Sequence, residues 1–147
     1  MNRTPFGITI AYGMPAIGAG YMYLLMSLYV MKFSTDVLLI APAVMGVIFS
    51  ISRIWDAVSD PIAGYLSDRT TFKFGRRRTW ILVSFIPISL GFLAVFSPPE
   101  SIQGQSLDLW MLIAILSFYS AITLLNVPHM ALGAELSEDY HERTRLF

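Results

Sequence analysis

Residues 4–31 read TPFGITIAYGMPAIGAGYMYLLMSLYVM, a stretch of 28 positions without a charged side chain. Residues 79–99 and 109–134 are likewise uncharged, over 21 and 26 positions. A helix needs about 20 apolar residues to cross the hydrocarbon core of a bilayer. Because backbone groups in lipid must bond to one another, we expect each stretch to form a membrane-spanning helix. The first stretch is too long for a signal peptide, and no A-x-A-like cleavage site follows it.

The overall composition agrees with a chain that is embedded in lipid. Of the 147 residues, 55% are hydrophobic and 14% are charged, and the mean hydropathy is +0.61. A soluble domain carries about 25% charged residues. The 10 basic and 10 acidic residues cancel, so the chain has no net charge to attract nucleic acid. The absence of cysteine excludes disulfides, thiolate metal sites and cysteine nucleophiles.

A fourth span, residues 37–66, is long enough to cross a membrane but contains Arg53, Asp56 and Asp60. It qualifies only if these charged side chains are accepted inside the helix. We therefore expect an all-α membrane protein with four transmembrane helices. The expected parts are helices at about 7–31, 37–66, 79–97 and 109–134, a cytoplasmic loop at 67–78 and a cytoplasmic tail at 135–147.

The distribution of lysine and arginine predicts the orientation in the membrane. The loop 67–78 has five basic residues, and Arg3, Arg143 and Arg145 lie on the same predicted side. The opposite side has only Lys32. Basic residues are enriched in cytoplasmic loops. We therefore expect a multi-pass protein of the cytoplasmic membrane, with its N-terminus, this loop and its tail in the cytoplasm.

The charged residues of the second span are spaced to share one helical face. Arg53, Asp56 and Asp60 stand at positions i, i+3 and i+7. Ionisable groups at bilayer depth cost at least about 2.5–3.5 kcal/mol each on insertion scales, so this face should border the bundle interior or a watery cavity. Its formal charge is minus one, which one Na⁺ or one proton would neutralise, and carboxylate oxygens suit such hard cations. The alternative is a permanent salt-bridge cluster, which does not need the second carboxylate.

The last predicted helix has a second polar face. Thr123, Asn126 and His129 recur at positions i, i+3 and i+6. Asn126 either makes an interhelical hydrogen bond or contributes to binding a cation or solute. His129 either titrates or is a neutral, hydrogen-bonded side chain. No nucleophile, base and orienting group occur together, so we do not expect an enzyme.

The loop between the second and third helices resembles that of the major facilitator superfamily. Residues 64–69 read GYLSDR and residues 75–78 read GRRR, similar to that superfamily's Gly-x-x-x-Asp-Arg…Gly-Arg-Arg pattern but with a longer insertion. Together with RIWDAVSDPIAGYLSDR and NVPHMALGAELSEDYHERTRL, the loop is similar to the glycoside–pentoside–hexuronide:cation symporter family, the melibiose-carrier group. The residues expected to act in gating and topology are Gly64, Asp68, Arg69, Gly75, Arg76, Arg77 and Arg78.

The resemblance implies a cation site shared between the second and fourth helices. Transporters of this family have twelve helices in two halves, so the chain would supply the N-terminal part of the first half. The positions that match the family's cation-binding residues are Asp56, Asp60, Ser59, Thr123 and Asn126. Arg53 would set the charge balance. In the melibiose-carrier group the position of Asn126 is an aspartate, so this chain has one carboxylate fewer.

The resemblance also bears on the solute. The family's sugar-binding acid on the first helix falls at Gly20, and its sugar-stacking tryptophan on the fourth falls at Met130, so neither group is present. A galactoside is therefore not expected, while another sugar or a sugar acid stays open. We expect a symporter that couples a small polar solute to Na⁺ or H⁺ and needs no cofactor. The alternatives are a lysolipid or other amphiphile symporter and a non-transporting membrane scaffold subunit.

Overall fold

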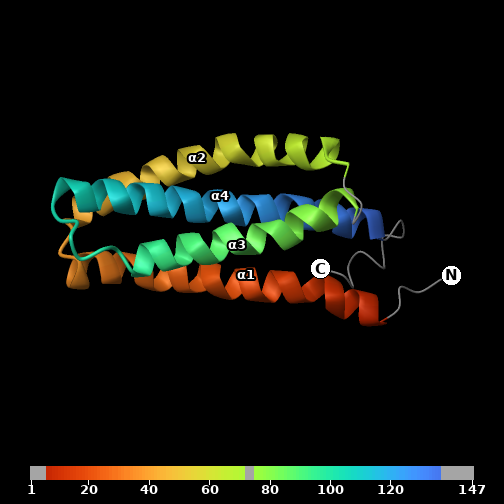
Figure 1. Cartoon of the computed structure of the whole chain (residues 1–147), viewed down its shortest axis with the longest axis horizontal. Coiled ribbons are helices and arrows are strands. Elements are labelled where there is room, and N and C mark those ends of the chain that lie inside the picture. Colours follow the sequence, from red (N-terminus) through yellow and green to blue (C-terminus); the bar gives the residue numbers. More distant parts are fainter. Residues whose placement is uncertain (1–5, 72–74, 137–147) are drawn as a thin grey trace.

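The computed structural model describes residues 6–71 and 75–136 and contains four long α-helices. They are α1 (Phe6–Lys32), α2 (Pro42–Arg69), α3 (Arg76–Phe96) and α4 (Gln105–Leu136). A π-helical turn, η1 (Phe33–Val37), continues α1. The described part of the chain has no β-strand. The expected fold class, an all-α membrane protein, is therefore confirmed, with the helices lying side by side along one axis (Figure 1).

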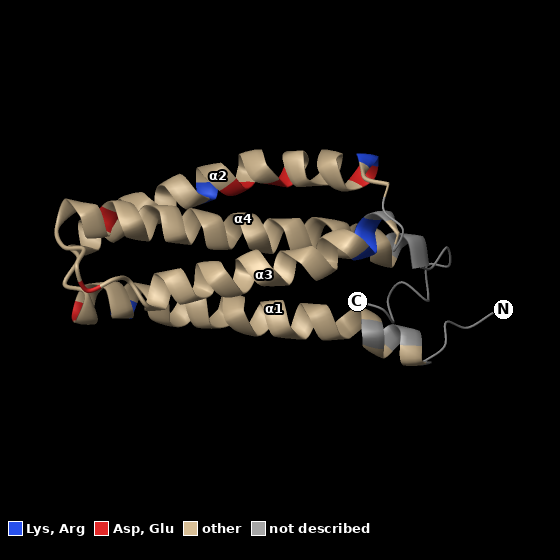
Figure 2. Cartoon of the chain, viewed as in Figure 1, with Lys and Arg blue, Asp and Glu red and all other residues tan. Residues whose placement is uncertain are grey.

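Three of the helical segments are long and apolar enough to cross a membrane. These segments are Tyr12–Val37, Arg77–Phe96 and Gln105–Gly133. Helix α2 does not meet the same criterion, because charged side chains lie inside it. It nevertheless runs along α4 in the same bundle (Figure 1). Figure 2 shows charged positions mainly at the helix ends, and one charged group partway along α2.

The connection between α1 and α2 differs from the expected one. The second helix begins at Pro42, not at 37, and it extends to Arg69, into the segment expected to be a loop. Proline suits the first turn of a helix because its fixed φ is helical and no N–H is needed there. The chain before it forms η1 and then reverses, with Leu39 at a φ of 57° and the Ile40 N–H bonded to the Ser34 carbonyl at 3.0 Å.

Helix α4 lies between α2 and α3 (Figure 1), and among the described residues it contributes more buried apolar side chains than any other helix. Half of its candidate span is buried, against 17% of the span that begins in α1. Its contact with α3 is close at Gly91, where an added Cβ would stand 2.9 Å from the Phe118 Cα. The largest fully buried side chains include Phe118, Met26, Met45, Ile88, Met111 and Ile115. This arrangement fixes α2 against α4, and these two helices carry the predicted site.

Candidate functional site

Arg53 and Asp56 form an ion pair on α2. The Arg53 Nη1 lies 3.4 Å from the Asp56 Oδ2, and the exposed fractions of the two side chains are 61% and 24%. The second carboxylate oxygen of Asp56, Oδ1, is buried and has no hydrogen-bond partner among the described residues. The carboxylate thus points one oxygen at the arginine and keeps a second one available inside the protein.

The other carboxylate of α2 is tied to α4. The Thr123 hydroxyl donates a hydrogen bond to the Asp60 Oδ1 at 3.0 Å, and Thr123 is buried. The structure therefore brings together two of the predicted residues from helices that are separated by α3 in the sequence. Two carboxylates and a hydroxyl are hard oxygen donors, which suit a small monovalent cation or a proton.

The other two predicted cation-site residues lie nearby without a direct bond to either carboxylate. The Ser59 hydroxyl donates to the Asp56 backbone carbonyl at 3.3 Å, so its proton is turned onto its own helix. Asn126 follows Thr123 by about one turn of α4, and its side chain is exposed. Within the described ranges, the Asn126 side chain forms no hydrogen bond.

Aromatic side chains complete the surroundings of the ion pair. The Arg53 guanidinium carbon lies 5.5 Å from the centre of the Tyr119 ring on α4. The Tyr23 ring of α1 meets Tyr119 edge-on, at 6.0 Å between centres, and Tyr23 lies close enough to Arg53 to interact with it electrostatically. The sequence marks Tyr23 only as a candidate interfacial or cavity aromatic, and Tyr119 was not predicted. The i, i+4 spacing between Tyr119 and Thr123 could have revealed Tyr119.

A second contact joins α1 to α4 away from the carboxylates. The Tyr12 hydroxyl donates to the His129 backbone carbonyl at 3.0 Å, and the His129 Nε2 lies 2.8 Å from the Tyr12 backbone carbonyl. The two rings stack with 4.1 Å between their centres. Of the two interpretations of His129, the structure therefore supports the hydrogen-bonded one.

The predicted gating and topology residues lie where α2 ends and α3 begins. The Arg77 Nη2 bonds the Asp68 Oδ1 at 3.1 Å across this connection, and the Arg69 guanidinium carbon lies 4.3 Å from the centre of the Tyr65 ring. Gly75 has a φ of 100°, a conformation that favours glycine, directly before α3. The Arg78 side chain is exposed, and the Arg76 side chain and residues 72–74 lie outside the described part.

The remaining residue of that motif, Gly64, lies at the α2–α4 contact. An added Cβ would stand 3.6 Å from the Val127 Cγ1, which is ordinary van der Waals contact. The two positions where sugar-binding side chains were missing, Gly20 and Met130, are both exposed. An added Cβ at Gly20 would contact no neighbouring group of the described structure within 4 Å, and position 130 is occupied by the methionine side chain.

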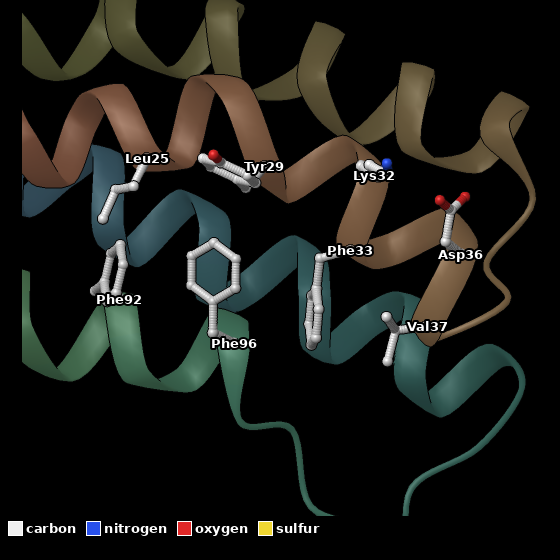
Figure 3. Close-up of a pocket in the computed structure, with 8 residues that line it drawn as sticks. All are labelled: Leu25, Tyr29, Lys32, Phe33, Asp36, Val37, Phe92 and Phe96. Carbon is white, nitrogen blue, oxygen red and sulfur yellow. The ribbon is translucent and has the colours of Figure 1, made fainter.

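A cavity of about 480 Å³ lies where the end of α1 and η1 face the end of α3 (Figure 3). It is mostly apolar, with aromatic rings from η1 and α3 and the charged Lys32 and Asp36 at its edge (Figure 3). Its lining residues are Leu25, Tyr29, Lys32, Phe33, Asp36, Val37, Phe92 and Phe96. None of the predicted cation-site residues lines it, so it is separate from the charged face of α2.

Comparisons with known proteins agree with these features. The profile of a family described as MFS/sugar transport protein matches residues 11–147. An uncharacterized symporter of Synechocystis sp. is 37% identical over an alignment of 150 positions that covers 99% of this chain. A putative glycoside/cation symporter of Escherichia coli strain K12 is 31% identical over 93% of the chain. A sodium-dependent lysophosphatidylcholine symporter of Danio rerio is 37% identical over 76% of the chain.

The chain matches only part of each of these relatives. It spans 28%, 30% and 21% of their respective lengths. The names of the relatives are those of transporters, in agreement with the expectation that the chain is not an enzyme. The match over nearly the whole chain, and the helix and loop motifs, lead to one conclusion. The chain belongs to the MFS/sugar transport protein family, the symporter family that its motifs resemble.

Proposed function

We propose that the chain forms the first helices of a symporter that couples the uptake of a small polar solute to a monovalent cation. One observation carries this proposal, the pairing of two α2 carboxylates that differ in their partners. Asp60 accepts the Thr123 hydroxyl at 3.0 Å, and Asp56 has a buried oxygen without a partner among the described residues. With Arg53 beside them, the group has a formal charge of minus one. One Na⁺ or one proton restores neutrality.

The proposed cation site consists of Asp56 and Asp60, with Thr123 as a third oxygen donor. Ser59 and Asn126 line its edge and complete it when a cation is bound. Na⁺ is held through these oxygens, whereas a proton is held by one carboxylate alone. The cation is cargo that moves with the solute, and we propose no resident cofactor.

The proposed solute is a sugar or a sugar derivative. The family description and the name of the Escherichia coli relative support this class. A lysolipid is the second candidate, which is supported by the name of the Danio rerio relative. We propose the cytoplasmic membrane as the location, with the N-terminus inside, because of the basic loop 67–78.

The proposal is tested by uptake of radiolabelled solutes. The full reading frame that encodes the chain is expressed in cells and assayed in sealed vesicles. A panel of sugars, sugar acids and lysolipids is supplied with an inward Na⁺ gradient, an inward proton gradient or neither. We expect accumulation of one solute class under one gradient, and its collapse when an ionophore removes that gradient. Accumulation that ignores both gradients would contradict the proposal.

A further inference from the structure

Arg53 has more hydrogen-bonding capacity than its ion pair uses. Only Nη1 approaches the Asp56 Oδ2, at 3.4 Å, and the arginine side chain is 61% exposed. A guanidinium carries five N–H donors in a planar fork. An exposed arginine partway along a membrane helix is costly if it faces lipid, so it is expected to face a cavity or a partner. The unused donors are therefore available to a ligand beside α2.

The aromatic rings around Arg53 hold its guanidinium in place. Tyr119 lies beneath it at 5.5 Å, and Tyr23 approaches both groups from α1. A ring face attracts a guanidinium and leaves the N–H groups at its edge free. A planar guanidinium that is held in one orientation can donate two parallel hydrogen bonds to the two oxygens of a carboxylate or phosphate, which the flexible ammonium of lysine does less well. Three helices thus position one cation for an anionic ligand.

The formal charges determine the order in which a cation and an anion bind. Arg53, Asp56 and Asp60 sum to minus one. An anion that arrives first raises the negative charge to minus two, whereas a cation that arrives first brings it to zero. Charges interact strongly in a medium of low dielectric constant, so the first order is disfavoured and the second favoured.

The geometry of Asp56 gives this order a structural basis. Its Oδ2 faces Arg53, while its buried Oδ1 has no hydrogen-bond partner among the described residues. A cation bound at Oδ1 competes with Arg53 for the same negative charge. The single, long contact between Arg53 and Asp56 is then weakened, and the guanidinium is released from the carboxylate.

We propose that Arg53 is the anchor for an anionic group on the solute, a carboxylate or a phosphate, and that cation binding at Asp56 frees it for this role. This inference rests on the proposed function and specifies its solute class. Because linkage is reciprocal, the anionic solute raises the affinity for the cation by the same factor.

The test uses two matched pairs of probes with the full reading frame in sealed vesicles. The first pair is 4-nitrophenyl β-D-glucuronide and 4-nitrophenyl β-D-glucoside, which differ in the carboxylate. The second pair is lysophosphatidic acid and a monoacylglycerol with the same acyl chain, which differ in the phosphate. We expect the anionic member of one pair to bind more tightly. Saturating Na⁺, or acid pH for proton coupling, should raise its affinity about fivefold or more.

Two substitutions then separate charge from shape. Arg53→Gln removes the positive charge. Arg53→Lys keeps the charge but replaces the planar guanidinium with an ammonium. Arg53→Gln should weaken binding of the anionic probe about tenfold or more, the loss expected for a hydrogen bond to a charged group. Arg53→Lys should weaken it by a smaller factor, and both substitutions should change binding of the neutral probe less than binding of the anionic probe. Lys32→Gln removes a positive charge at the far end of α1 and is the control, which should bind both probes like the parent.

The outcomes distinguish this inference from the function on which it rests. A parent protein that binds the members of both pairs equally contradicts the anchor, as does a loss of both members in Arg53→Lys. If uptake is driven by a cation gradient but shows no preference for an anionic solute, only this inference fails. If uptake ignores Na⁺ and proton gradients, the proposed function fails as well.

Discussion

At the scale of single residues, the two carboxylates of α2 differ in their partners. Asp60 is held by the Thr123 hydroxyl at 3.0 Å, so its orientation depends on α4. Asp56 is paired with Arg53 at 3.4 Å on its own helix, so its orientation is local. The binding of a cation to both carboxylates therefore depends on how α2 packs against α4. This difference leads to two predictions.

Replacing either carboxylate should uncouple the ion from the solute. Asp60→Asn or Asp56→Asn changes the local formal charge from minus one to zero, so the site no longer needs a cation for neutrality. We expect gradient-driven accumulation to be abolished, while equilibrium solute binding survives in weakened form. The measurement compares both quantities for each variant. If both variants concentrate solute like the parent, the two acids are structural.

Removing the hydroxyl of Thr123 should weaken cation binding without abolishing it. Thr123→Val keeps the shape of the side chain but leaves Asp60 without its donor from α4. A hydrogen bond to a charged group contributes about 1.5–3 kcal/mol, so cation affinity should fall about tenfold. Thr35→Val is the matched control, because the Thr35 hydroxyl bonds only groups close by in its own segment. Equal cation affinities in the two variants would contradict a role for Thr123.

At the scale of elements, the position of α4 between α2 and α3 depends on a close approach at Gly91. The backbone of Phe118 occupies the place where a side chain at Gly91 would begin, at 2.9 Å. The end of α2 and the start of α3 are held together by another kind of contact, the ion pair between Asp68 and Arg77. The first contact sets the spacing of two helices, and the second links the end of α2 to the start of α3.

A methyl group at Gly91 should separate α3 from α4. Gly91→Ala forces the backbones apart, and such overpacking destabilises a protein by about 1–3 kcal/mol. Gly46→Ala is the matched control, because no atom of the described structure lies within 4 Å of its added Cβ. Alanine favours a helix over glycine by about 1 kcal/mol, so this control should be as stable as the parent or more so. Thermal unfolding of the purified protein in detergent measures both changes.

Removing the ion pair at the loop should alter transport rate more than cation affinity. Asp68→Asn eliminates the charge that Arg77 contacts at 3.1 Å, far along α2 from Asp56 and Asp60. We expect a changed uptake rate and changed accessibility of the cytoplasmic side, with cation affinity close to that of the parent. Uptake kinetics and labelling of introduced cysteines report these two properties. If both are unchanged, the loop charges serve only to orient the chain.

At the scale of the whole molecule, the four helices leave much apolar surface exposed, as a bilayer requires. On α1, the exposed fractions of Met14, Ile17 and Leu28 are 65%, 74% and 62%. Charged positions lie mainly at the two ends of the bundle (Figure 2). The basic Arg69 and Arg77 lie near one end of α3, and the acidic Glu100 and Asp108 lie beyond its other end.

The predicted orientation is tested by labelling from one side of the membrane. A membrane-impermeant thiol reagent should modify Thr71→Cys only from the cytoplasmic side, because its loop carries five basic residues. The same reagent should modify Gln103→Cys, at the other end of α3, only from outside. The chain has no natural cysteine, so each variant has a single thiol. Labelling of Thr71→Cys in intact cells would reverse the orientation.

The lengths of the uncharged stretches and the spacing of the charged residues predict most of the helical arrangement. They identify three spans directly, and they place Arg53, Asp56 and Asp60 on one face of a fourth helix. The start of α2 at Pro42 was not predicted, because η1 continues α1 beyond its uncharged part.

The pairing between helices could not be obtained from such patterns. The bond of Thr123 to Asp60, the place of Tyr119 under Arg53 and the close approach at Gly91 depend on which faces of two helices meet. Periodicity identifies the faces of one helix, but it does not say which neighbour each face contacts.

The paired bonds between Tyr12 and His129 determine the tautomer of the imidazole. A backbone carbonyl only accepts hydrogen bonds, so the His129 Nε2 that lies 2.8 Å from the Tyr12 carbonyl must carry the hydrogen. The lone pair of the ring is then on Nδ1, so the imidazole offers a donor to Tyr12 and keeps an acceptor on its other nitrogen. The contact between α1 and α4 therefore consists of two hydrogen bonds in opposite directions, each from a side chain of one helix to a backbone carbonyl of the other.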